Sequence, residues 1–167
     1  VFLSDQPTRL ELNRFSKIYS KTPDMVMVFI DWGKFVDQDV IKDVYGTKSV
    51  LVVTWEPWDA IGKKGIDYKA LLKGSYDRYI SDFASKIKDI KGEVFIRFAH
   101  EQNGDWYPWS GKKIGSEDYV KMWRYVKDLF DKNGVANARW IFAVNWEDVP
   151  CDNHFLQYYP GNEYTDY

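Results

Sequence analysis

Residues 97–109 hold most of the side chains in this sequence that could do chemistry together. Glu101 supplies a carboxylate at the end of an apolar run, and His100 and Asn103 place an imidazole and an amide beside it. Two tryptophans stand in the polar turn that follows, Trp106 and Trp109. A positioned acid, groups that hydrogen-bond hydroxyls, and flat apolar ring faces are together what a sugar-handling site needs. The stretch therefore favours carbohydrate chemistry at one carboxylate.

Further candidate residues end the other apolar runs. Glu56 is the second acidic candidate, although a structural role for it is nearly as plausible. The other candidate sugar contacts are Trp55, Trp58, Asn145 and Trp146. The candidate stacking platforms are Trp58, Trp106, Trp109 and Trp146. Any single one of these four has about even odds of being a core residue, but each lies in or beside a polar turn, so a core role for all four is not expected. Arg97, charged within an apolar strand, either holds a carboxylate beneath the site or forms an ordinary structural ion pair.

Alternating strands and helices must position these side chains. Continuous apolar runs predict strands at 25–32, 49–56, 93–101 and 139–146, with residues 1–3 ending an earlier one. Helical periodicity predicts helices over 8–19, 35–44, 76–90 and 116–130. Thr8 and Glu11 have capping-box spacing, Ser116 is the expected N-cap of the last helix, and Gly134 is expected to close it.

This alternation predicts βαβ units and a parallel sheet, either doubly wound or closed into a (β/α)8 barrel. Polar and aromatic residues end every strand, which favours the barrel, because a barrel builds its site from many strand ends. The chain has 167 residues, fewer than the roughly 250 of a complete barrel. We therefore expect residues 1–167 to form a single domain that contains about the first five βα units.

Composition excludes several classes of protein. The net charge is -2 and no basic block occurs, so we expect no nucleic-acid partner. The apolar runs are too short to cross a bilayer, so no membrane role is expected. The single cysteine, Cys151, has no activating motif and no disulfide partner, and the two histidines lack metal-ligand spacing. We expect no metal and no cofactor.

The stretch 97–109 resembles the acid/base motif of glycoside hydrolase family 26, which consists mainly of bacterial endo-β-1,4-mannanases with some mixed-linkage β-glucanases. The His100-Glu101 pair carries the resemblance, because related barrels usually have Asn before the acid/base Glu. Residues 54–58 resemble the family motif after the third strand, and Asn145 falls where the family often ends its fifth strand. Residues 158–167 resemble the run that leads into the sixth strand. Gln102 departs from the family, which frequently has Met there.

The resemblance implies a retaining endo-β-glycanase in which Glu101 is the general acid and then the general base. Retention requires a second carboxyl group about 5–5.5 Å away, and partial burial and that negative neighbour would favour the protonated form of the acid. The family carries this nucleophile at the end of its seventh strand, outside residues 1–167. We therefore expect the chain alone to be inactive and the remaining C-terminal part of the barrel to be its partner.

The resemblance further implies a bacterial, secreted or cell-surface protein that acts on a polysaccharide or oligosaccharide. β-Mannan is the first expected substrate and mixed-linkage β-1,3-1,4-glucan the second. Two other hypotheses stay open: a non-catalytic carbohydrate-binding relative that keeps the aromatic groove, and a structural fragment whose partner chain completes the barrel.

Overall fold

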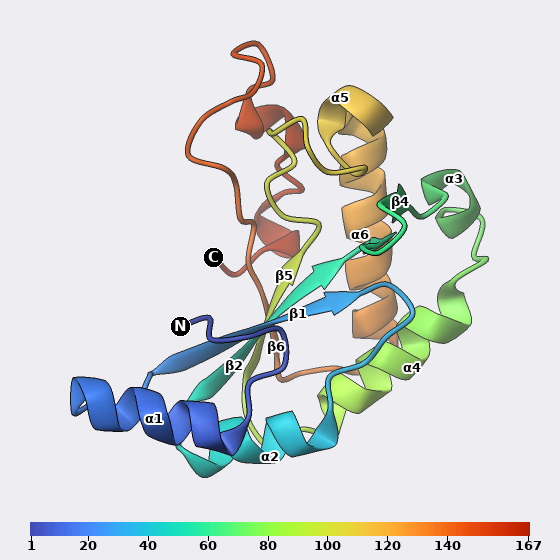
Figure 1. Cartoon of the computed structure of the whole chain (residues 1–167). Helices are drawn as coiled ribbons and strands as arrows, with labels where there is room; N and C mark the ends of the chain where they lie inside the picture. Colours follow the sequence, from blue (N-terminus) through green and yellow to red (C-terminus); the bar gives the residue numbers. More distant parts are fainter.

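A four-stranded parallel sheet forms the centre of the structure, a computed structural model that describes residues 1–167 (Figure 1). In spatial order its strands are β1 (Met25–Asp31), β2 (Val50–Glu56), β5 (Val94–Phe98) and β6 (Ala138–Trp140). Every neighbouring pair is parallel. A separate antiparallel hairpin, β3 (Trp58–Asp59) with β4 (Lys64–Gly65), follows β2.

The longer helices cover one face of this sheet, and the other face has none (Figure 1). They are α1 (Arg9–Tyr19), α2 (Gln38–Gly46), α4 (Asp77–Lys88) and α6 (Ser116–Lys132). The short helices α3 (Tyr68–Leu71) and α5 (Gly111–Ile114) pack against α6, and two 3-10 turns, η1 (Phe155–Tyr158) and η2 (Asn162–Tyr164), follow β6. A core of 31 buried residues fills the helix-covered side and includes Leu12, Val44, Phe83, Trp123, Val28, Val53 and Ile96. A doubly wound sheet carries helices on both faces, so this one-sided arrangement belongs to a barrel.

The opposite side of the sheet, here called the helix-free face, carries the alternate residues of the strands. In β1 the residues that point away from the core are only partly buried, as expected from the period of two. Cross-strand register places Asp31 beside Glu56, and Thr54 beside Arg97. Strands β1 and β2 therefore end with carboxylates on the face that would be a barrel interior.

Short chain segments line both edges of the sheet. The amides of Met27 and Phe29 in β1 donate to the carbonyl oxygens of Val1 and Asp5 at 2.8 and 3.4 Å. The first residues thus run beside β1, but they form no regular strand, so the strand predicted to end at residues 1–3 is absent. At the other edge, Tyr167 N donates to Trp140 O at 3.1 Å, and Tyr167 O accepts from Phe142 N at 2.9 Å. Residues 166–167 therefore lie where a further strand would pair with β6.

The helix-start predictions were partly confirmed. Thr8 and Glu11 form the predicted capping box, with both reciprocal hydrogen bonds present. Ser116 is not the N-cap of α6, because the helix already includes it and Gly115 takes the cap position with φ of 81°. Gly134 follows the end of α6 with φ of 69°, as predicted for a closing glycine.

Two strands end earlier than predicted. The strand expected over 93–101 stops at Phe98, and the strand expected over 139–146 stops at Trp140. Beyond both ends the chain stays hydrogen-bonded in isolated contacts, such as Ile141 N to Ile96 O at 2.9 Å. Apolar residues continue past both strand ends, which is why the sequence predicted longer strands. The backbone nevertheless leaves the strand conformation after Phe98 and after Trp140.

Candidate active site

Glu101 lies just past the C-terminal end of β5, on a turn that leaves its carboxylate partly exposed to solvent. Its side chain is 28% exposed. Arg97 Nη2 lies 3.3 Å from Glu101 Oε1, and Trp106 Nε1 donates to Glu101 Oε2 at 3.2 Å. Each carboxylate oxygen therefore has one protein partner, and the carboxylate is fixed while still reachable. Of the two roles considered for Arg97, this contact supports the one in which it holds a carboxylate.

Unusual backbone angles produce this turn. Ala99 and Glu101 have φ of 44° and 54°, in the left-handed region that side-chain-bearing residues seldom adopt. Two hydrogen bonds hold the strained segment: Tyr119 Oη donates to Ala99 O, and Glu101 N donates to Ala143 O, both at 2.8 Å. Such strain persists only where neighbours enforce it, and it concentrates at functional sites.

His100 lies behind the carboxylate rather than beside the open space. It is 2% exposed, and its Nε2 lies 3.0 Å from Tyr107 Oη and 3.9 Å from Glu56 Oε1. Burial lowers the pKa of His100 to about 3, with Arg97 contributing, so the ring is neutral near pH 7. Its Nδ1 is buried without a hydrogen-bond partner. His100 is therefore placed to support Glu56 and Tyr107, and its burial argues against the expected direct sugar contact.

Glu56 ends β2 on the helix-free face and is 5% exposed. Trp58 Nε1 donates to its Oε2 at 3.2 Å. Burial raises the pKa of Glu56 to about 7, and nearby Asp31 raises it further while Trp58 and Arg97 oppose the change. A carboxyl group that changes charge near neutral pH, in the row of strand ends that includes Glu101, is a functional candidate with a stated physical cause.

The structure separates the tryptophans that the sequence grouped together. Trp106 is 43% exposed and Trp146 is 89% exposed, so both offer ring faces to a ligand. Trp58 is partly buried against Tyr107 and Trp109. Trp55 is fully buried on the helix-covered side, stacked 4.2 Å from Phe83.

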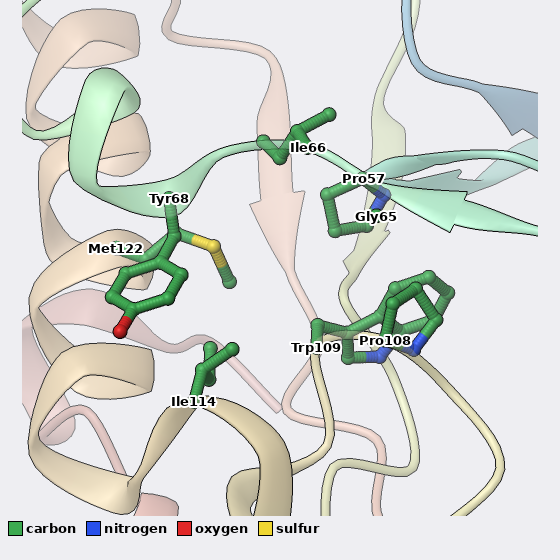
Figure 2. Close-up of a pocket in the computed structure, with 8 residues that line it drawn as sticks. All are labelled: Pro57, Gly65, Ile66, Tyr68, Pro108, Trp109, Ile114 and Met122. Carbon is green, nitrogen blue, oxygen red and sulfur yellow. The ribbon is translucent and has the colours of Figure 1, made fainter.

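Trp109 is also buried, and its Nε1 donates to His100 O at 2.7 Å. Figure 2 shows Trp109 and Pro108 packed beside Pro57 and Gly65, around a space of about 10 Å³ that is too small for a sugar ring. A Cβ on Gly65 would lie 2.6 Å from Pro108 Cβ, so the hairpin can approach only with glycine there. The burial of Trp109 argues against the stacking role expected for it, and the burial of Trp55 argues against the substrate contact expected there.

Asn103 and Asn145 hold the loop after β6 rather than face a ligand. Asn103 is fully buried, accepts from Asn145 N at 2.8 Å, and donates through Nδ2 to Asn145 O at 3.0 Å and Asp148 Oδ1 at 2.9 Å. Asn145 Nδ2 donates to Glu147 O at 2.7 Å. These bonds fix the loop that carries Trp146, so both amides position the site from behind.

Sequence reasoning missed two participants, Tyr107 and Asp31. Tyr107 contacts His100, and burial raises its pKa to about 12. Asp31 ends β1 next to Glu56. Their common signal was available, since each follows or ends a predicted strand. Among the described residues, which are the whole of 1–167, no group of three His, Cys, Asp or Glu side chains could hold a metal ion, and no helix is both long and apolar enough to cross a membrane.

A one-sided parallel sheet with carboxylates along its C-terminal strand ends is typical of the α/β barrel class, which builds its sites at these strand ends. The sequence comparison makes the family explicit. Residues 20–167 match the model of glycosyl hydrolase family 26, and the chain belongs to this family. The family predicted from the His100-Glu101 motif is confirmed.

Relatives match the chain over parts of much longer proteins. Endoglucanase H of Acetivibrio thermocellus is 33% identical over 99% of this chain, which spans 18% of that protein. The mannan endo-1,4-beta-mannosidase A of Piromyces is 23% identical over 79% of the chain, which covers 23% of it. Both relatives bear the names of glycoside hydrolases, as the family does.

The fold comparison agrees. The solved GH26 domain of the endo-β-mannanase/endo-β-glucanase PbGH26-GH5A from Prevotella bryantii superposes on 99% of this chain with a TM-score of 0.72 at 14% identity. The chain spans 64% of that domain. Residues 1–167 thus have the fold of part of an α/β barrel, which confirms the predicted fold class.

Proposed function

We propose that the protein containing this chain is an endo-acting β-glycanase that hydrolyses a β-1,4-linked polysaccharide with retention, and that Glu101 is its general acid/base. One observation carries the proposal. The Glu101 carboxylate stands at a barrel strand end, held by Arg97 at 3.3 Å and Trp106 at 3.2 Å, with part of its surface open. The acid/base role itself comes from the family resemblance of this position.

In this mechanism Glu101 first donates its proton to the glycosidic oxygen while the bond from that oxygen to the anomeric carbon breaks. A nucleophilic carboxylate, proposed to lie outside residues 1–167, forms a bond to the same carbon. Glu101 then removes a proton from the water that displaces the carboxylate. Arg97 stabilises the ionised form of Glu101 between the two steps, and Trp106 fixes the other oxygen.

The exposed rings extend the site into a groove for a polymer. Trp106 and Trp146 are proposed to stack on sugar rings, while Glu56 and Trp58 bind hydroxyls or support the groups that do. A polysaccharide too large to enter a cell would be met outside it, so secretion or cell-surface display is proposed with this function.

The relatives leave two substrates to separate. The expected β-mannan is favoured by several mannanase relatives, which are 23–28% identical over parts of the chain. The relative named endoglucanase matches nearly the whole chain at 33%. Because that match is both longer and closer, we place β-glucan first and β-mannan second. Product analysis on mixed-linkage glucan, glucomannan and mannan distinguishes them.

Replacing the proposed acid/base tests the function. In the protein that carries residues 1–167, Glu101→Ala should lower polysaccharide turnover by about 10²–10⁴-fold, the usual contribution of general acid/base catalysis. Binding of the polysaccharide, measured by affinity electrophoresis, should change little. Reducing-sugar release measures the turnover.

Glu147→Ala, which removes an exposed carboxylate, is the control and should keep full activity. Equal turnover of Glu101→Ala and the unsubstituted protein would refute the assignment. If the unsubstituted protein binds polysaccharide without releasing sugar, the carbohydrate-binding hypothesis replaces the enzyme.

A further inference from the structure

The indole of Trp106 reaches Glu101 from an exposed turn. Its Nε1 donates to Glu101 Oε2 at 3.2 Å, while 43% of the residue stays exposed. Exposed side chains change rotamer freely unless a neighbour restrains them. The residue two positions earlier, Gly104, is buried, and its backbone lies against the indole. Gly104 is therefore the neighbour that can restrain this ring.

A side chain at Gly104 would collide with the face of the Trp106 ring. A Cβ there would lie 2.6 Å from both Cε2 and Cη2 of Trp106, with Cζ2 between them. Because these neighbouring ring atoms are almost equally close, the Cβ would stand over the ring face rather than beside its edge. Carbon atoms pack at about 3.5–4.0 Å, so the indole would have to move by about 1 Å. The φ of Gly104 is not positive, so space rather than backbone conformation requires the glycine.

Hydrogen bonds on both sides of Gly104 keep its backbone in place. Its N–H donates to Glu101 O at 2.9 Å, and its carbonyl oxygen accepts from Ser110 Oγ and, at 3.3 Å, from Asn153 Nδ2. Ser110 and Asn153 are 0% and 1% exposed, so a backbone shift would leave buried polar groups without partners. A collision at Gly104 would therefore be relieved by the exposed side chain of Trp106 and not by the backbone.

We propose that Gly104 is a positioning residue for the proposed reaction. Its missing side chain lets the Trp106 indole lie on the backbone of the turn, where the indole N–H holds one oxygen of Glu101. If the indole moved away, Glu101 Oε2 would lose its protein partner, and only Arg97 would hold the carboxylate. The inference rests on the proposed function and deepens it, because it names a residue that acts on the acid/base through Trp106.

A double-mutant cycle tests whether Gly104 acts through Trp106. In the protein that carries residues 1–167, Gly104→Ala should lower kcat/KM for the polysaccharide by about 10- to 100-fold, the effect of losing one hydrogen bond to a charged acceptor. Trp106→Ala should lower it at least as much. Adding Gly104→Ala to Trp106→Ala should cost less than about twofold more, because no ring is left to displace. A Gly104→Ala loss that is as large without Trp106 as with it would overturn the proposal.

The indole signal of Trp106 gives a second measurement that does not depend on turnover. Trp106→Phe identifies the Nε1–H resonance by its loss from the NMR spectrum of the isotope-labelled protein. Gly104→Ala should shift this resonance, because the N–H leaves the Glu101 carboxylate, and an unchanged resonance would contradict the proposal. If Gly104→Ala does not fold, the double variant with Trp106→Ala should recover cooperative unfolding. A double variant that also fails to fold would count against the collision with Trp106.

Gly46→Ala is the matched control. A Cβ there would lie 2.5 Å from Arg9 Nη1, a similar overlap, but Gly46 is exposed at the end of α2 and the guanidinium is the far end of a flexible side chain. This variant should change neither turnover nor the Trp106 resonance. If Glu101→Ala abolishes turnover while Gly104→Ala alters neither measurement, the proposed function stands without the positioning role. Unchanged turnover in Glu101→Ala would instead refute the function, whatever the resonance of Trp106 shows.

Discussion

Glu56 and His100 are neighbouring buried groups whose pKa values are shifted in opposite directions. Burial raises the pKa of Glu56 to about 7 and lowers that of His100 to about 3. Each group is uncharged in the fold under conditions where the unfolded chain would ionise it. Burial therefore disfavours the ionised form of both groups, because neither has a close partner of opposite charge.

The raised pKa of Glu56 predicts a measurable dependence of the free energy of unfolding on pH. Between its ordinary value of 4.5 and about 7 the folded protein holds a proton that the unfolded chain has released. The free energy of unfolding therefore falls as pH rises through this window, and the penalty persists above it. Glu56→Gln should be more stable relative to the unsubstituted protein at pH 8 than at pH 4.5, by roughly 1–3 kcal/mol. Urea unfolding at both pH values measures the difference.

Glu147→Gln, at an exposed carboxylate, should show no such pH-dependent difference. In Glu56→Gln the opposite contribution of His100 remains, which is present above pH 6.5 and is lost as pH falls toward 3. A Glu56→Gln stability difference that is the same at both pH values would contradict the raised pKa.

At the scale of elements, the turn after β5 depends on α6. Tyr119 lies fully buried in the first turns of α6, and its hydroxyl donates to the carbonyl oxygen of Ala99 at 2.8 Å. Ala99 has a positive φ and lies two residues before Glu101. One hydrogen bond thus connects the helix start to the backbone that orients the proposed acid.

Tyr119→Phe should lower the free energy of unfolding by about 1–3 kcal/mol, because the Ala99 carbonyl oxygen would be left buried without its donor. Activity should fall as well, since the strained turn loses a restraint. Thermal unfolding and reducing-sugar release measure the two effects.

Tyr125→Phe on the same helix removes a hydrogen bond from a partly exposed hydroxyl to Asp77. It should cost less than about 1 kcal/mol and leave activity intact. Similar losses in stability and activity from both variants would show that the Ala99 contact has no special role.

At the scale of the molecule, the core lies on one side of the sheet. Trp55, Phe83 and Trp123 belong to it, while Trp146 lies on the loop after β6 and is 89% exposed. Trp55→Ala should cost about 3–5 kcal/mol of stability, the usual result of removing a buried ring.

Trp146→Ala should change stability by less than about 0.5 kcal/mol and should weaken polysaccharide binding. Chemical denaturation and affinity electrophoresis compare the two variants. A large stability loss in Trp146→Ala, or none in Trp55→Ala, would mean that core and surface are assigned the wrong way round.

The strand and helix interiors could be read from the sequence because their apolar periods are unbroken over 7 or more residues, as in β1, β2 and α6. The ends of β5 and β6 could not. Ala99 and Glu101 adopt left-handed backbone angles, which are unusual for these residue types and which the sequence therefore does not predict. Hydrogen bonds with Tyr119 and Ala143 hold this conformation. The short hairpin β3–β4 and helix α3 were missed for a similar reason, since packing on Pro108 and α6 stabilises segments too short to show a period.

The sequence by itself determined the strand-helix alternation, the position of Glu101 after an apolar strand, and the family through the His100-Glu101 pair. Only the tertiary structure decided which aromatic and polar side chains are buried in the core and which face the candidate site or solvent. Trp55 and Glu56 are adjacent in the sequence, yet one stacks in the core and the other faces the site, because successive strand residues point to opposite faces and helices cover only one of them.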